Sequence, residues 1–353
     1  RWFDGATAGA PANNGYFVYG QSNGNPGSYV DKANFTTDTL SASTKLGGNK
    51  SQNHIGTGDR RNGYISGNTP SGQPGAEKIN FTTDATSYAP GCNSLPAGSG
   101  AYNNGAATST KTHIYQDLGV YWIGFNKITT STDTNELLST TAYATPGQQA
   151  REYSAAVGNP SAGYFIGGTI WNTPAPSYGP GYGDTGNTDS RVYKFTYSSD
   201  TGSIVPGSNI NRTSNQGIEL HYATESSTAG YVIGGRSSST PSYMSEFKKF
   251  TFATETASSL PGPSVSMPSA DVSGATTASS AAYFGKYQES RQFKFTYASE
   301  TGGWTPGMEY TAWPARPYRS RSHCSPSDCH IPINIPPTAT PTSPTTLTGP
   351  QGI

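Results

Sequence analysis

Two short sequence motifs alternate six times along the 353-residue chain, and this repeat constrains the fold more than any other feature. The first motif is an aromatic and apolar run bounded by glycine in most copies, as in Gly163-Tyr-Phe-Ile-Gly-Gly168. The second starts with lysine and ends with an acid, as in Lys194-Phe-Thr-Tyr-Ser-Ser-Asp200. Successive acids are 46, 49, 67, 55 and 45 residues apart. A period near 50 residues is the size of one β-propeller blade.

Both motifs have the pattern of β-strands. The first occupies residues 15–20, 63–67, 121–124, 163–168, 230–235 and 282–285. The lysine and acid that bound the second are Lys32 and Asp38, Lys78 and Asp84, Lys127 and Asp133, Lys194 and Asp200, Lys249 and Glu255, and Lys294 and Glu300. In most copies aromatic or aliphatic residues lie five and three positions before the acid, with Lys, Thr or Asn between them, which predicts a strand with one apolar face. Pro-Gly follows the acid at 90–91, 206–207, 261–262 and 306–307. We expect these dipeptides to mark strand exits.

The pattern of each unit therefore predicts three or four short antiparallel strands. One such sheet cannot bury both of its faces, but six arranged radially can. We predict an all-β fold over residues 1–316, a six-bladed β-propeller of antiparallel four-stranded blades. Residues 317–335 then form a cysteine-containing connector, and residues 336–353 a Pro/Thr-rich extended C-terminal tail. The tail ends in Gly349-Pro-Gln-Gly352, which matches the beginning of a collagen-like segment.

The composition fits this interpretation and excludes several functions. Only 12% of the residues are charged, and 22 Lys and Arg balance 22 Asp and Glu. A net charge of zero gives no long-range attraction to nucleic acid, so we expect no nucleic-acid partner. No apolar run approaches the ~20 residues of a membrane span, so we expect no membrane insertion. The 23 tyrosines and 13 phenylalanines indicate a folded chain.

The repeat resembles the kelch-type β-propeller repeat. The resemblance is carried by the apolar runs that end in glycine pairs, Ile166-Gly-Gly168 and Ile233-Gly-Gly235, and by the spaced aromatics of Tyr193-Lys-Phe-Thr-Tyr197. In its Ser/Thr/Gly-rich style the chain also looks like virion proteins of bacteriophages, especially those that infect cyanobacteria. This resemblance implies a virion or extracellular location. The turn Ser198-Ser-Asp-Thr-Gly202 is similar to the Asp-box of sialidase-type propellers, which implies an architectural role for the acids.

The repeated lysines and acids admit two interpretations. They can form a polar rim that binds an anionic sugar or an ion. Alternatively, each lysine pairs with the acid of a neighbouring blade, or each acid accepts hydrogen bonds within its own turn. We favour the structural interpretation, because a feature present in all six units serves every unit, whereas catalytic sites break such symmetry.

One insertion breaks the symmetry, and it lies between the two motifs of the fourth unit. It contains Trp171, Tyr178 and Tyr182. Long loops on a rigid scaffold often carry binding, and aromatic side chains stack on sugars or enter protein interfaces. We therefore predict these three residues as binding residues, with packing against the blade edge or a neighbouring subunit as the alternative.

The remaining candidates concern covalent modification and metal. Cys324 and Cys329 are spaced to close a small disulfide ring in an oxidising compartment, and together with His323 and His330 they are the nearest approach to a zinc-binding set. We favour the disulfide, and expect no metal site and no cofactor. Asn-x-Ser/Thr sequons that glycosylation would use occur at Asn34, Asn49, Asn80 and Asn211.

These features favour a non-enzymatic structural or recognition module of an extracellular assembly, such as a phage tail fibre or virion appendage that binds a cell-surface receptor or glycan. Its partners would be other subunits of the assembly, further copies of itself, and a surface glycan. A secreted glycan-binding propeller is the alternative. A sialidase-type glycoside hydrolase is less favoured, because no sequence motif links the arginines and acids that such chemistry needs.

Overall fold

The structure is a computed structural model, and it describes the strands of the repeat and the short turns that join them. The described residues are 14–18, 29–45, 52–59, 61–68, 76–89, 92, 106–117, 124–138, 151–152, 154–170, 187–210, 218–236, 247–260, 272–286, 291–309, 323–324 and 329–330. Within these residues every regular element is a β-strand. No helix that could cross a membrane occurs in this part of the chain.

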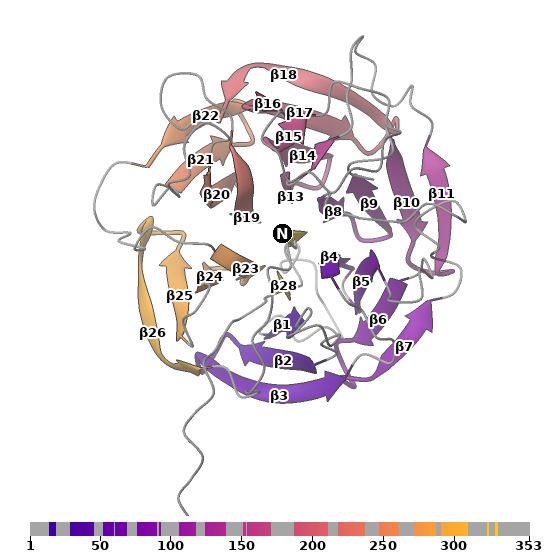
Figure 1. Cartoon of the computed structure of the whole chain (residues 1–353), viewed down its shortest axis with the longest axis vertical. Coiled ribbons are helices and arrows are strands. Elements are labelled where there is room, and N and C mark those ends of the chain that lie inside the picture. The colour runs from indigo at the N-terminus through magenta and orange to yellow at the C-terminus, as the bar shows by residue number, and fades with distance from the viewer. Residues whose placement is uncertain are drawn as a thin grey trace, which may run out of the picture.

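The strands form a six-bladed β-propeller, as the repeat predicts. Figure 1 shows the six sheets around a central axis, with β8, β13, β19 and β23 innermost in blades 3 to 6. From β1 to β26, the strands of each blade follow one another from the inside to the outside and pair antiparallel. Blade 1 contains β1 (Asn14–Val18), β2 (Tyr29–Asn34) and β3 (Thr39–Lys45); blade 2, β4 (Gln52–Gly58), β5 (Asn62–Asn68), β6 (Ala76–Asn80) and β7 (Thr86–Ala89); blade 3, β8 (Ala107–Ser109), β9 (His113–Asp117), β10 (Phe125–Thr129) and β11 (Thr134–Leu138); blade 4, β13 (Ala155–Gly158), β14 (Ala162–Ile166), β17 (Arg191–Thr196) and β18 (Thr201–Asn209); blade 5, β19 (Glu219–Glu225), β20 (Ala229–Arg236), β21 (Phe247–Thr251) and β22 (Thr256–Ser259); and blade 6, β23 (Val272–Thr277), β24 (Ala281–Lys286), β25 (Arg291–Thr296) and β26 (Thr301–Glu309).

Two short strands from the region predicted as a connector pair with the first two blades. β28 (Cys329–His330) pairs parallel with β1 and takes the inner position of blade 1, and β27 (His323–Cys324) pairs parallel with β4. A separate three-stranded sheet lies at the base of the insertion in blade 4. It consists of β12 (Arg151–Glu152), β15 (Thr169–Ile170) and β16 (Asn187–Thr188).

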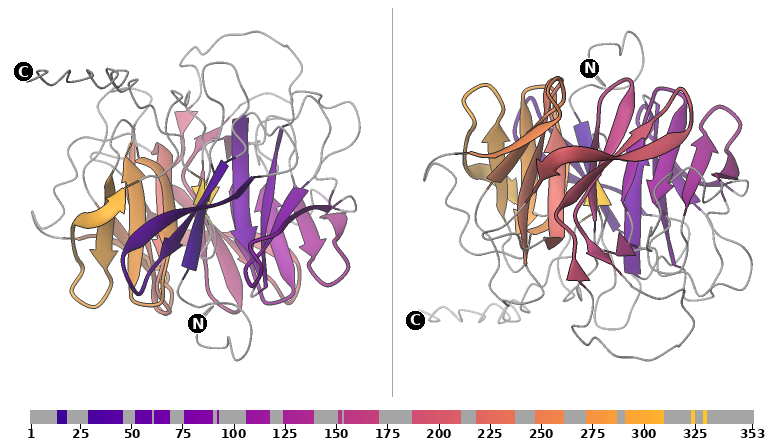
Figure 2. Two further views of the ribbon diagram at one scale, coloured as in Figure 1. Left: turned by 90° about the horizontal axis from the view of Figure 1, so that it is seen from below. Right: turned by 90° about the horizontal axis from the view of Figure 1, so that it is seen from above.

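The antiparallel order places two kinds of short hairpin on one face of the ring. The inner strand joins the second strand there, and the third joins the outer strand there, as in the turns 159–161 and 197–200 of blade 4. The second strand ends and the third begins on the opposite face, where the outer strand of each blade also ends and the next blade begins. Figure 2 shows the blades from the side, with the strands running between these two faces.

The hydrophobic core lies between neighbouring blades. Tyr16, Val30, Ile65, Ile79 and Phe81 fill the space between blades 1 and 2. Tyr64, Ala76, Ile114 and Ile128 belong to the cluster between blades 2 and 3. Equivalent clusters join the other blades, and the last of them extends from blade 5 through blade 6 to Ala33 and Leu40 of blade 1. The spaced apolar residues of the second motif therefore pack against the adjacent blade.

The glycine that opens the first motif allows the blades to approach each other closely. A Cβ atom on Gly163 of blade 4 would lie 2.3 Å from Cγ2 of Thr108 in blade 3. A Cβ atom on Gly230 of blade 5 would lie 2.6 Å from Cγ2 of Val157 in blade 4. A larger residue at these positions would push neighbouring blades apart. This explains why the motif has glycine there.

Two expectations about the strands are wrong. Pro206-Gly207 and Pro306-Gly307 do not end strands: they form bulges inside the outer strands β18 and β26, which regain their pairing at Asn209 and Glu309. An outer strand pairs on one side only, so it tolerates a proline that lacks a backbone donor. The dipeptides at 90–91 and 261–262 lie outside the described residues.

In the third unit, the second strand of the blade is β9 rather than the run Tyr121-Trp-Ile-Gly124. Tyr115 on β9 pairs with Lys127, just as Tyr64 pairs with Lys78 in blade 2. The pairing register, and not the presence of glycine, decides which run enters the sheet. Residues 121–123 lie outside the described part of the chain.

Candidate functional site: a ring of tyrosine, lysine and acid between the blades

The repeated lysines and acids form ion pairs between adjacent blades. In each case the lysine comes from one blade and the acid from the next, which is the pairing that one of the structural interpretations of the sequence expects. The Nζ to carboxylate oxygen distances are 2.9 Å for Lys32 and Asp84, 2.8 Å for Lys78 and Asp133, 2.5 Å for Lys127 and Asp200, 2.5 Å for Lys194 and Glu255, 2.5 Å for Lys249 and Glu300, and 2.7 Å for Lys294 and Asp38. The last pair joins blade 6 to blade 1, so the ion pairs run around the whole ring.

A tyrosine completes each of these groups. It lies directly opposite the lysine in the sheet, and its hydroxyl group points to the same acid. Tyr16 donates a hydrogen bond to Asp84 at 2.5 Å, and four others do the same: Tyr64 to Asp133 at 2.6 Å, Tyr164 to Glu255 at 2.9 Å, Tyr231 to Glu300 at 3.2 Å and Tyr283 to Asp38 at 2.5 Å. The sixth, Tyr115, also interacts with its acid, Asp200. We call each group an interblade bridge.

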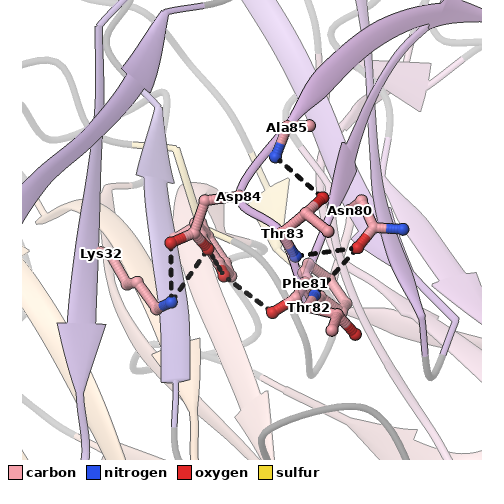
Figure 3. A network of polar contacts seen from close by, with 8 residues as sticks. Lys32, Asn80, Phe81, Thr82, Thr83, Asp84 and Ala85 are labelled. Atoms are coloured by element: carbon pink, nitrogen blue, oxygen red, sulfur yellow. Dashed lines mark hydrogen bonds and ion pairs between the residues drawn. The ribbon is translucent and has the colours of Figure 1, made fainter.

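A tight hairpin presents the acid of each bridge. All six acids have a left-handed backbone conformation, with φ between 51° and 56°. In blade 2 the Asp84 amide donates to the Asn80 carbonyl at 2.8 Å, while Asn80 Oδ1 accepts from the amides of Thr82 and Thr83 at 2.9 and 3.0 Å. Figure 3 shows this turn and the two bonds from Lys32 to Asp84. The turn therefore aims its carboxylate at the preceding blade.

Hydroxyl groups on both sides of the acid strengthen these hairpins. In five of the six turns the residues just before and just after the acid share a hydrogen bond of 2.7 Å, as in Thr37 and Thr39. In blade 2 Ala85 replaces one partner, and its amide donates to Thr83 Oγ1 instead. This explains why Ser and Thr surround the acid in the sequence.

The electrostatics of the bridges are those of partly buried ion pairs. The lysine side chains are 17–32% exposed and the acids 29–34%. Five of the lysine Nζ atoms lie 5.3–6.0 Å from the centre of the tyrosine ring in their own blade, a favourable cation–π distance. Burial and the adjacent acid raise the pKa of Tyr64, Tyr164 and Tyr283 well above the usual range. Burial alone would raise the pKa of Glu255, but hydrogen bonds from Lys194 and Tyr164 outweigh it and lower that pKa.

The bridges consequently orient each blade against the next. Each carboxylate accepts hydrogen bonds from a lysine, and five of the six also from a tyrosine, both on the preceding blade. The lysine charge that a bound anion would need is thereby neutralised inside the ring. This arrangement is suited to holding the propeller together.

The three aromatic residues predicted for binding, Trp171, Tyr178 and Tyr182, lie outside the described residues. The base of their insertion is described, and it contains a polar cluster around Asp189. The buried Asp189 carboxylate accepts from Arg191 Nε at 2.8 Å and from the Tyr193 hydroxyl at 2.9 Å. Its backbone amide donates to Gly168 at the other end of the insertion, at 2.7 Å. Asp189 therefore joins the two ends of the insertion to blade 4.

The sequons occur in two settings. Asn34 and Asn80 end the third strands of blades 1 and 2, where Oδ1 of each side chain caps the following turn. These two asparagines thus have a conformational role in the repeat. Asn49 and Asn211 lie outside the described residues, and glycosylation of all four remains a prediction.

The side chain of one cysteine is described, and those of the other two are not. Cys92 is completely buried between blades 2 and 3, and burial raises the pKa of its thiol to about 12, which makes it unreactive. The backbones of Cys324 and Cys329 belong to β27 and β28, but their side chains lie outside the described part, so the disulfide remains a prediction. Among the described side chains, no cluster of three or more His, Cys, Asp or Glu residues is present.

Sequence reasoning missed the tyrosines of the bridges and the Asp189 cluster. A signal for the tyrosines was available, because in five units a tyrosine directly follows the glycine or alanine at the start of the first motif. Asp189 is not part of the repeated motifs, so the repeat could not reveal it. In comparisons with known proteins, the chain matches no protein-family model and no curated protein sequence.

Proposed function

We propose that this protein is a non-enzymatic structural and recognition module: a kelch-like propeller, displayed on an extracellular assembly such as a phage tail fibre or virion appendage, that binds a cell-surface glycan or receptor. The observation that carries the proposal is the use of all six repeated lysine and acid pairs in bridges between blades. A ring held in this way is a rigid support for loops. Function then depends on the segments that differ between blades.

The insertion of blade 4 is the segment best suited to binding. Both of its ends are fixed, by the three-stranded sheet of β12, β15 and β16 and by the hydrogen bonds of Asp189. Anchored ends reduce the entropy that a loop loses when it binds. Trp171, Tyr178 and Tyr182 supply aromatic surface between these ends, and such surface suits stacking on sugar rings.

The same insertion supports the alternative, a secreted glycan-binding propeller of a cell surface. The two functions share their chemistry and differ in the assembly to which the protein belongs. Tail and capsid genes beside the gene for this protein would support the virion assignment, whereas a neighbourhood of secretion genes would support the alternative.

A glycan array tests the recognition function. We expect the purified chain to bind a subset of surface glycans, and a triple variant with Trp171→Ala, Tyr178→Ala and Tyr182→Ala to lose at least tenfold in affinity. Tyr88→Ala is the matched control, because Tyr88 is an exposed tyrosine, 53% accessible, on the outer strand of blade 2. Equal binding by the triple variant and the control would overturn the assignment of the insertion.

The alternative of a sialidase-type glycoside hydrolase predicts that the protein hydrolyses a glycan. Incubation of the folded protein with sialosides and with other surface glycans, followed by analysis of the released sugars, decides the question. We expect no release. Release that depends on the protein would reject the non-enzymatic function.

A further inference from the structure

A single acid stands at a buried position where the other blades have neutral residues. The position is the last residue of the inner strand, which pairs with the second residue of the next strand. In blades 2 to 6 it is occupied by Gly58, Ser109, Gly158, Glu225 and Thr277. Since a buried carboxylate is costly to keep charged, Glu225 requires a specific explanation.

Glu225 lies at the interface between blades 4 and 5. Its side chain is almost completely buried, and Oε2 accepts a hydrogen bond of 2.5 Å from the backbone amide of Gly158 in blade 4. Oε1 is buried and has no hydrogen-bond partner among the described residues. One oxygen thus connects the two blades, and the other is held away from water.

Among the described titratable groups, the charge of Glu225 acts on two buried tyrosines. Tyr197 belongs to blade 4 and Tyr297 to blade 6, and the charge of Glu225 raises the pKa of both, after burial as the main cause. Their hydroxyl groups are engaged with Thr108, at 2.8 Å, and with Thr277, at 3.5 Å. Neither tyrosine offers a positive charge that would compensate an ionised Glu225.

We propose that Glu225 is a protonation-dependent latch between blades 4 and 5: the neutral acid fits this interface, and ionisation loosens it. The inference is independent of the proposed binding function. Burial raises the pKa of Glu225 to about 8, although the hydrogen bond from Gly158 and the positive charge of the amino terminus act in the opposite direction.

The pH window follows from this shift. Between the unfolded pKa of about 4.3 and the folded pKa of about 8, the native protein retains a proton that the unfolded chain releases. The contribution of Glu225 to stability is therefore complete below that window and is lost as pH rises through it. The loss approaches tenfold in the folding equilibrium constant per pH unit and stops above about pH 8.

Urea unfolding of the wild type and of Glu225→Gln, from about pH 5 to pH 9, tests the latch. The amide accepts the same hydrogen bond from Gly158 and does not titrate. We expect the variant to gain stability relative to the wild type by up to tenfold in equilibrium constant per pH unit, with a plateau above about pH 8. Glu136→Gln, at an exposed position on β11, is the matched control and should run parallel to the wild type. Parallel curves for Glu225→Gln as well would overturn the proposal.

A second measurement on the wild type keeps the proposal testable if the variant does not fold. The hydrogen-exchange protection factor of the Gly158 amide, corrected for the intrinsic pH dependence of exchange, should fall at least tenfold between about pH 6 and pH 9. The Ile166 amide, on β14 of the same blade, serves as the reference and should change much less. A constant ratio of the two protection factors would reject the latch.

Discussion

The two interfaces of blade 6 have the same bridge but different cores. Towards blade 5, Phe247 stacks on Phe295 with ring centres 4.7 Å apart, and Tyr231 stacks on Tyr297 at 5.2 Å. Towards blade 1, Phe35 stacks on Tyr283 at 5.0 Å, but the fully buried amide of Gln292 has no hydrogen-bond partner among the described residues.

The position of Gln292, two residues before the bridge lysine, is apolar in every other blade. Its equivalents are Val30, Ala76, Phe125, Val192 and Phe247. The bridge is thus constant around the ring, while the apolar packing beneath it differs from one interface to the next. The interface that closes the ring, between the last blade and the first, therefore has an unsatisfied amide at a position that is apolar in every other interface.

The largest effect is expected from removing an aromatic ring between blades 5 and 6. Phe295→Ala should lower the free energy of unfolding by about 3–5 kcal/mol, because the ring is fully buried and contacts both Phe247 and Tyr231. Urea denaturation measures the change. Tyr88→Ala, on the exposed surface, should change stability by less than about 0.5 kcal/mol. A loss below about 1 kcal/mol for Phe295→Ala would show that this interface does not carry the stability assigned to it.

An opposite and smaller effect is expected at the closing interface. Gln292→Val should raise the free energy of unfolding by about 1–3 kcal/mol, because it removes an unsatisfied buried amide and restores the residue found at this position in blades 1 and 4. Gln292→Asn retains the amide and should give no gain. If the valine variant is less stable than the wild type, the amide has a partner that stabilises the closed ring.

The smallest effect should come from the bridges themselves, and it should be similar at both interfaces. Lys249→Met and Lys294→Met should each cost about 1 kcal/mol or less, because both ion pairs are about one-third exposed. Comparing each variant with the wild type in low and high salt measures the electrostatic part, which should decrease at high salt. A much larger loss at only one interface would contradict the equivalence of the bridges.

The number of blades was predictable from the sequence, because the lysine and acid of each unit have fixed spacing and their alternation with the aromatic runs counts the units. The pairing between one unit and the next was harder to predict, because spacing within a unit contains no information about which neighbour a side chain faces. The register of β9 was missed because glycine content, and not pairing, was used to identify the second strand. Asp189 and Glu225 are not part of the repeated motifs. Their roles depend on three-dimensional contacts that the repeat does not reveal.

The direction of the bridges has a consequence for how such a ring changes in evolution. Every blade presents lysine and tyrosine on one side and an acid on the other, so its two sides are complementary rather than identical, like the subunits of a cyclic oligomer. A chain with one blade fewer or one more would still match lysine to acid at every joint, including the last. The bridges therefore specify the polarity of the blades but neither their order nor their number, which depend on the chain connections and on the packing of the cores between the blades.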